Sequence, residues 1–234
     1  MKTKTRVFRS VLAAFGLAVL FGVFSVSETN AQVLREILNR MDLNYKGLSS
    51  LQSDVTLVKY NEQIGKSDTS IGNTSYLPKT AKRAMYVRID WTKPVAESIV
   101  VIGEDYVMYR PTLNQVIKGK ANSSKNSKVP GNALSFVSMS KAQLQANYDV
   151  KYIAEEEIKG GIKTWHVLLT PKTATSYKSA ELWVDADGMP RQAKVNENNG
   201  DTTTILLSAI KKNVKLDTSV FKLSYPSGTK EIKG

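Results

Sequence analysis

The stretch that decides the predicted fold is RAMYVRIDWTKPVAESIVVIGEDYVMYRP, residues 83–111. It begins with strict alternation, which places one set of apolar side chains on a single side of an extended strand. This set consists of Met85, Val87, Ile89 and Trp91. After a break at Lys93-Pro94 comes a β-branched run, and a turn at 103–105 leads into residues 106–109. The stretch therefore predicts consecutive antiparallel strands with one apolar face, which either packs on a core or holds an apolar ligand.

The residues on either side of this stretch carry helix and strand signals of their own. Residues 33–46 place apolar side chains three and four positions apart, which predicts an amphipathic helix that ends near Gly47. From residue 49 to residue 60 the period changes to two, and the more polar strand that follows ends at 77–78. A further short strand is expected at 115–118.

The middle of the chain interrupts the strands. Residues 119–131, GKANSSKNSKVPG, are small, polar and basic, which is typical of a mobile connection. Residues 132–148 then return to a helical pattern. Within it, Ser140 is the expected N-cap of a short helix that runs through Leu144.

The remainder of the chain is predicted to be strand. The expected strands are 149–153, 163–170, 179–185, 191–197 and 202–210. Asp187-Gly188 and Asn199-Gly200 are typical of hairpin turns, because their residues tolerate positive φ. Many antiparallel strands with few helices cannot form layers of equal area. We therefore predict a mainly β (α+β) fold, in which a strongly curved antiparallel sheet of about 10–11 strands forms an unclosed β-barrel with a helical lid.

The start of the chain indicates export. Four basic residues precede an apolar segment at 11–26, and small residues at 29 and 31 suit cleavage before Gln32. The apolar segment is somewhat short for a membrane span, and an uncleaved anchor is the alternative. We expect residues 1–31 to be a cleaved signal peptide and residues 32–234 to be one soluble exported domain.

The charge of the chain bounds its partners. It carries 33 basic and 21 acidic residues, a net charge of +12, and the expected signal peptide removes four of the basic and one of the acidic residues, which leaves +9. Such a surface suits transient contact with an anionic membrane or with an acidic partner, and the alternative is that the charge only keeps the protein soluble. We expect no nucleic-acid partner for an exported chain, and we expect a monomer.

The sequence offers few parts for catalysis. It has no cysteine and a single histidine, His166, so zinc sites and nucleophile–base pairs lack their usual residues. We expect His166 to be structural or exposed. The consecutive residues 155–157, all glutamate, do not converge as an acid/base pair must, and we interpret them as a solvated turn. Residues 185–188 match a calcium loop poorly and are predicted to be a hairpin turn. No enzyme activity and no cofactor are predicted.

The order of motifs along the chain resembles the family of periplasmic lipoprotein carriers, LolA. Lys82-Arg83 before the alternating strand, followed by Pro94 and then Glu97-Ser98-Ile99, matches that family's most recognisable block. Gly103, Tyr109-x-Pro111 and Gln115 continue the match in register. Further similarity lies in YDVK at 148–151, VLLTPK at 167–172, DTTT at 201–204, and Phe221 followed by YPSG at 225–228.

The resemblance implies a carrier that holds the acyl chains of lipoproteins in a concave pocket and shuttles them from the inner to the outer membrane. It implies two partners, an ABC-type release complex in the inner membrane and an acceptor in the outer membrane. The alternatives are a carrier of free lipids or glycolipids and a regulatory domain that responds to envelope stress.

The residues expected to carry this function form three groups. The pocket residues are Met85, Val87, Ile89, Trp91, Ile99, Val101 and Met108, and ordinary core packing is the alternative for each. The lid residues are Leu34, Leu38, Phe136 and Met139. Arg83 matches the family's lid-latching arginine, and the resemblance implies that its guanidinium bonds backbone carbonyls of the lid helices.

Overall fold

The computed structural model describes residues 25–120, 136 and 139–234. Within these ranges the chain forms twelve β-strands, two α-helices and two short 3₁₀ helices. None of the described helices is both long and apolar enough to cross a membrane. The predicted signal peptide and the predicted mobile connection fall almost entirely outside the described residues.

The first half of the sheet is a meander that follows the alternating stretch. Its six strands are β1 (Leu51–Asn61), β2 (Lys66–Leu77), β3 (Tyr86–Lys93), β4 (Glu97–Ile102), β5 (Asp105–Arg110) and β6 (Gln115–Lys120). Each strand pairs antiparallel with the next. The short 3₁₀ helix η1 (Pro111–Leu113) makes the turn between β5 and β6. The predicted antiparallel strands of residues 83–111 are thus confirmed.

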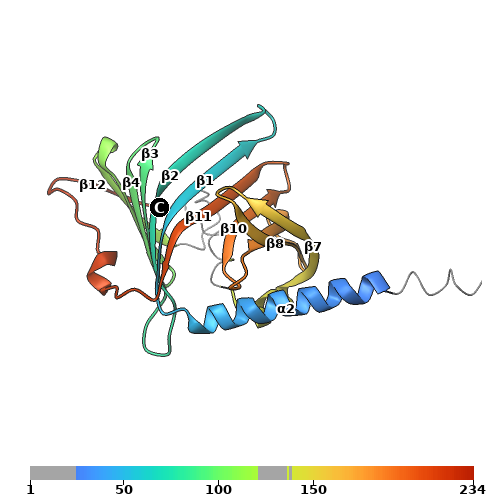
Figure 1. Cartoon of the computed structure of the whole chain (residues 1–234). Coiled ribbons are helices and arrows are strands. Elements are labelled where there is room, and N and C mark those ends of the chain that lie inside the picture. Colours follow the sequence, from blue (N-terminus) through green and yellow to red (C-terminus); the bar gives the residue numbers. More distant parts are fainter. Residues whose placement is uncertain (1–24, 121–135, 137–138) are drawn as a thin grey trace, which may run out of the picture.

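The second half is another meander, and it is joined to the first by a pairing of distant strands. Its strands are β7 (Tyr148–Ile158), β8 (Ile162–Pro171), β9 (Tyr177–Val184), β10 (Pro190–Glu197) and β11 (Thr202–Lys212). β11 pairs antiparallel with β1, so the two meanders become one continuous sheet. The sheet curves strongly around one side, as Figure 1 shows.

The sheet does not close into a barrel. Its order is β12-β6-β5-β4-β3-β2-β1-β11-β10-β9-β8-β7, so β12 and β7 form its two edges. The edge strand β12 (Lys230–Lys233) pairs parallel with β6 and was not predicted. The curved, unclosed sheet with few helices is confirmed, with twelve strands in place of the ten or eleven expected.

Two helices cover the inner side of the curved sheet. The long helix α2 (Ser25–Gly47) runs beneath the sheet in Figure 1 and contacts β7, and the short helix α4 (Lys141–Asn147) also packs on β7. Ser140 caps α4 as predicted: its hydroxyl accepts a hydrogen bond from the Gln143 N–H, and the Gln143 side chain accepts one from the Ser140 N–H. The inner faces of both sheet halves and the two helices share one hydrophobic core.

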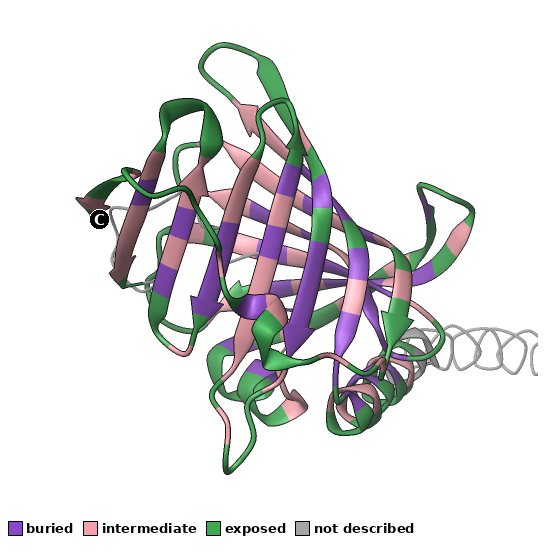
Figure 2. Ribbon diagram, turned by 90° about the vertical axis from the view of Figure 1, so that its left-hand side faces the viewer, coloured by how far each residue is buried: buried purple, intermediate pink, exposed green. Residues whose placement is uncertain are grey.

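A smaller apolar cluster lies on the outer side of the sheet. The 3₁₀ helix η3 (Thr218–Phe221) places Phe221 against Tyr86, with their ring centroids 5.3 Å apart. Arg88 donates to the Val220 carbonyl oxygen over 2.7 Å and pairs with Asp90. The alternating side chains of β3 therefore contribute to both clusters. The apolar set faces the inner side of the sheet, whereas the side chains between them, Tyr86 and Arg88, contact the C-terminal segment on the outer side. Figure 2 shows buried and less buried residues alternating along the strands.

Candidate functional site

The predicted pocket residues lie together on the inner face of the sheet. Ile89 is paired with Ile99, and Ile99 with Met108, so these side chains form one row across three strands. Val87 is paired with Val101 in the next row. All seven nominated side chains belong to the same core cluster, in which five are buried while Met85 and Val87 are partly buried. The structure brings the set together, and binding of a ligand by it stays a prediction.

The helix α2 supplies one cover of the shared core, on the side of β7. Leu38 is buried in the shared core, and Leu34 packs against it. Ile37 and Met41 are buried beside them, although they were not nominated for the lid. Their three- and four-residue spacing was the available signal, because it places all four side chains along one stripe of the helix.

α2 is fastened to the turn between β9 and β10. Arg40 donates to the Ala186 carbonyl oxygen over 2.8 Å, and its guanidinium lies 5.4 Å from the centre of the Trp165 ring. Gly188 in the same turn has φ of +79°, and a Cβ at this position would collide with the backbone of Arg40. The turn was predicted from Asp187-Gly188, whereas its contact with the backbone of helix α2 could not be predicted from the sequence.

An aromatic group holds the second part of the cover. Phe136 is buried, and its ring lies 5.8 Å from that of Tyr148 and 6.5 Å from that of Tyr177. The two tyrosine hydroxyls are 2.6 Å apart, and burial of Tyr177, reinforced by this hydrogen bond, raises the pKa of its phenol. Met139 packs against the same core. The two tyrosines were missed because they lie at the ends of strands, outside the alternating stretch.

Arg83 lies in the loop between β2 and β3. Its backbone forms an isolated bridge with Thr80, and its Nη2 donates to the Pro78 carbonyl oxygen over 3.2 Å. The Nε of Arg83 is buried and has no hydrogen-bond partner among the residues that the structure describes. Residues 132–135 and 137–138 of the second expected lid segment lie outside those residues, although all four nominated lid residues are described. The latch to lid carbonyls therefore stays a prediction.

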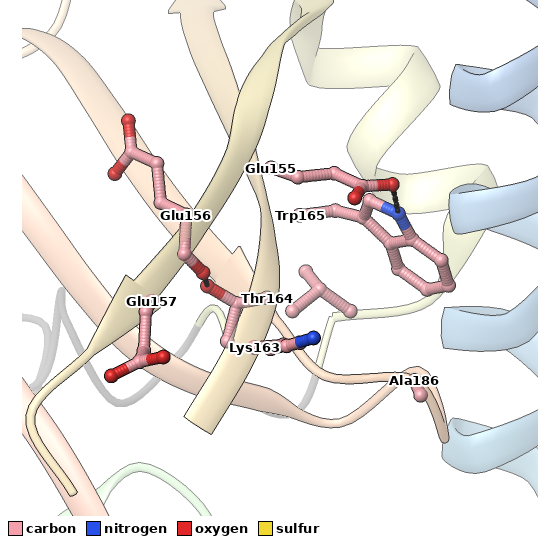
Figure 3. Close-up of a pocket in the computed structure, with 8 residues that line it drawn as sticks. Glu155, Glu156, Glu157, Lys163, Thr164, Trp165 and Ala186 are labelled. Carbon is pink, nitrogen blue, oxygen red and sulfur yellow. Dashed lines mark hydrogen bonds between the residues drawn. The ribbon is translucent and has the colours of Figure 1, made fainter. Parts of the chain in front are cut away.

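The glutamates expected in a solvated turn lie instead in strand β7, so that interpretation was wrong. Register pairs Glu155 with Trp165 and Glu156 with Thr164. Successive strand residues point to opposite faces, and Figure 3 shows the side chains of Glu155 and Glu156 directed away from each other. Three consecutive glutamates are not a usual strand pattern, so the strand was not predicted. In the structure, Glu155 contacts Trp165 on one face of the sheet, and Glu156 contacts a polar group on the other.

That polar group is built around His166 on the outer face. The Nδ1 of His166 lies 2.9 Å from a Glu156 oxygen, and its Nε2 lies 2.9 Å from a Glu181 oxygen. Its ring stacks on Trp183 with centroids 4.3 Å apart, and the Trp183 indole donates to Glu156 over 2.8 Å. His166 is buried, and its hydrogen bonds confirm the structural role expected of it.

The two carboxylates of this group make the stability of the protein depend on pH. Hydrogen bonds from Trp183 and His166 lower the pKa of Glu156. Burial opposes ionisation of Glu181, but Asn196, Lys194 and His166 together lower its pKa. A lowered pKa in the folded state stabilises the fold at pH values above the pKa of the unfolded chain, about 4.3 for glutamate, and this stabilisation disappears as the pH falls.

We therefore expect the free energy of unfolding to decrease as the pH is lowered from about 5 to 3. Glu156→Gln is expected to flatten part of that decrease, measured as urea unfolding at a series of pH values. Glu157→Gln is the matched control, because Glu157 lies on the same strand but pairs with Lys163 on the other face. An equal slope in the Glu156→Gln protein and the unsubstituted protein would contradict this account.

A small cleft of about 340 Å³ opens beside α2, at the far end of β7 and β8. Its lining residues are Glu155, Glu156, Glu157, Lys163, Thr164, Trp165, Val184 and Ala186. Glu155 accepts a hydrogen bond from the Trp165 indole over 3.2 Å. None of the nominated pocket residues lines this cleft. Five of the seven nominated pocket side chains are buried, so a ligand that contacts them must displace other side chains or move the cover.

Comparison with known proteins identifies the same family as the sequence motifs. The family model described as outer membrane lipoprotein carrier protein LolA matches residues 80–224. A protein of Nitrosospira multiformis named outer-membrane lipoprotein carrier protein is 27% identical over 176 residues, which are 71% of this chain and 79% of that protein. These matches support the motif-based resemblance, and the matched range includes all seven nominated pocket residues.

Solved structures show the same fold. An uncharacterised conserved protein from Thermus thermophilus matches with a TM-score of 0.54 and 17% identity, covering 86% of this chain and 99% of that one. The structure of MucB matches with a TM-score of 0.50 and 14% identity, covering 81% of this chain and 62% of that one. At these identities the likeness concerns the fold alone.

Proposed function

Because this chain belongs to the family of outer membrane lipoprotein carrier proteins, LolA, we propose that it binds the acyl chains of lipoproteins on its inner face and carries them across the periplasm. The observation that carries this proposal is the position of the nominated side chains. Those of the pocket and those of the lid belong to one apolar cluster, which extends over both halves of a curved, unclosed sheet. A sheet open at two edges can widen to admit a ligand without breaking strand pairs.

Movement of the cover would lower the affinity of such a carrier for its cargo. Burial of one methylene contributes about 0.8 kcal/mol, so a fully enclosed sixteen-carbon chain would gain about 12 kcal/mol. A carrier that bound this tightly would not release its cargo. Displacing Leu38 and Phe136 from the core opposes binding, because both are buried when the face is closed. The net affinity is the difference between acyl-chain burial and the loss of these contacts.

Methionine side chains suit the same task. Met108 lies in the row of inner-face side chains, and Met85 and Met139 pack at the margin of the cluster. Methionine is unbranched and flexible, so it can repack around acyl chains of different shape at little cost. The proposed activity includes no covalent step, and no residue in the proposal acts as a catalyst.

The proposal places the protein between two membranes. After export, with residues 1–31 removed, the domain of residues 32–234 would receive lipoproteins from an ABC-type release complex in the inner membrane. It would deliver them to an acceptor in the outer membrane. The net charge of +9 that remains on this domain, 29 basic against 20 acidic residues, supports transient contact with anionic lipid on either side.

The first test is the identity of what the protein carries. We would purify the exported chain from its own periplasm, denature it, extract it and analyse the extract by mass spectrometry. Acylated peptides or intact lipoproteins are the expected result. Phospholipids or glycolipids alone would make the protein a carrier of free lipids. If the protein carried nothing and did not bind hydrophobic dyes, the inner-face side chains would be ordinary core residues and the carrier function would be refuted.

A second test concerns Arg83. Arg83→Leu is expected to leave the fold intact, because the one side-chain hydrogen bond described for Arg83 joins it to its own loop. We expect cargo release to an acceptor to slow by tenfold or more, measured as transfer of an acylated peptide. Lys82→Leu is the matched control, since it removes the same charge from the neighbouring position. Equal transfer rates for the two variants would rule out a latch.

A further inference from the structure

Exposed apolar side chains gather at one rim of the sheet. Ile64 in the turn between β1 and β2 is 66% exposed, and Val95 in the turn between β3 and β4 is 50% exposed. Leu113 in the turn between β5 and β6 is 57% exposed. Scattered surface aliphatic residues are ordinary, but here every second turn of the first meander presents one.

The strand register places these three turns on the same side of the molecule. Ile71 in β2 pairs with Lys93 near the end of β3, and Ser98 at the start of β4 pairs with Tyr109 near the end of β5. The ends of β1, β3 and β5 and the starts of β2, β4 and β6 therefore lie along one rim of the sheet. Figure 1 and Figure 2, which share a vertical axis, both show these turns opposite the helix α2. The turns stand apart from one another, as separate contacts on a broad surface would.

The charges around the turns favour an anionic surface over another apolar protein face. Lys66 follows Ile64 by two residues, and Lys93 precedes Val95 by two. Lys230 lies at the third turn, where its N–H donates to the Asn114 carbonyl oxygen over 3.0 Å.

Several carboxylates are also present near the turns. Glu97 is paired with Arg110 over 2.9 Å, and Asp201 accepts a hydrogen bond from the Glu62 N–H. The side chains of Glu62 and Asp68 are the acidic groups nearest the first turn. The lysines beside the tips are exposed, so they can follow lipid phosphates while the aliphatic tips enter the acyl region.

We propose that these three turns form a membrane-docking rim, defined by Ile64, Val95 and Leu113, that contacts an anionic lipid bilayer. The inference deepens the proposed carrier function, because it locates the surface that would meet each membrane. A bilayer is the occupant that fits best: it is flat and wide enough for three separated tips, and it needs no matched pocket. The tips insert shallowly and reversibly, as transfer between two membranes requires.

The test uses the exported chain purified from the periplasm, with its N-terminus established by mass spectrometry. Binding to vesicles of phosphatidylethanolamine and phosphatidylglycerol is measured by co-sedimentation. The triple variant Ile64→Ser, Val95→Ser, Leu113→Ser is expected to bind at least tenfold more weakly, because three apolar tips are lost together. Leu43→Ser is the matched control: Leu43 is 70% exposed on α2, away from the rim, and its loss is expected to change binding less than twofold.

Three results would overturn the inference. The first is unchanged vesicle binding by the triple variant, and the second is equal weakening by Leu43→Ser. The third is a native dimer, seen by light scattering, that the triple variant converts to monomer, since the rim would then bind a second copy. The same samples are analysed for bound lipid. If the triple variant loses vesicle binding but still carries cargo, the result supports the membrane-docking rim independently of the carrier function. If the unsubstituted protein binds vesicles but never carries cargo, only the proposed carrier function is refuted.

Discussion

Gly188→Ala is expected to destabilise the protein by roughly 2–5 kcal/mol and to loosen α2 from the sheet. Gly188 has a positive φ, which costs an L-residue conformational energy. Its added methyl group would also collide with the backbone of Arg40, which cannot rotate away as a side chain could. The two costs add, since the first belongs to the turn and the second to the contact between turn and helix. Equilibrium unfolding in urea measures the sum.

Gly65→Ala separates the two costs. Gly65 also has a positive φ, of +63°, but nothing lies within 4 Å of a Cβ there. Its substitution is expected to cost about 1 kcal/mol, the conformational part alone. If Gly188→Ala were no more destabilising than Gly65→Ala, the turn would not be the seat of α2, and the cover would be held by its apolar stripe alone.

Phe136→Ala is expected to have the second large effect, a loss of about 3–5 kcal/mol from the closed state. The ring is buried against Tyr148 and Tyr177, and removing it leaves a cavity between the cover and the start of β7. Because the proposed cargo must displace this ring, the same change should strengthen binding of a hydrophobic dye to the inner face. Urea unfolding and dye titration together measure the two consequences.

Tyr177→Phe is the control for this experiment. It keeps the ring that packs on Phe136 and removes only the hydroxyl that bonds Tyr148 over 2.6 Å. The expected cost is about 1 kcal/mol, with dye binding nearly unchanged. Reduced dye binding by Phe136→Ala would show that the ring is part of the ligand site and not a barrier to it.

Several features of this protein followed from local sequence patterns. The alternation of residues 83–111 determined three strands and their inner face, because side-chain direction in a strand depends only on position. The helix stripe of residues 33–46 and the cap at Ser140 were readable for the same reason. Most strands of the second half were also placed, since hairpin dipeptides such as Asp187-Gly188 marked their ends.

Other features depended on contacts between residues far apart in the chain. Strand β12 could not be predicted, because its four residues, KEIK, carry no strand pattern and form a strand by pairing with β6. Residues 155–157 were misread as a turn, because three consecutive glutamates are compatible with a strand only when His166 and Trp183 receive Glu156 on the outer face.

The same reason explains the candidate site. The sequence by itself determined that an apolar inner face exists, because periodicity is a local property. Only the tertiary structure decided what covers that face: α2 seated on Gly188, and Phe136 held between Tyr148 and Tyr177. It also brought three separate hairpin turns to one rim. The arrangement of the cover depends on the pairing of β1 with β11, which joins the two meanders into one sheet and which no short stretch of the chain encodes.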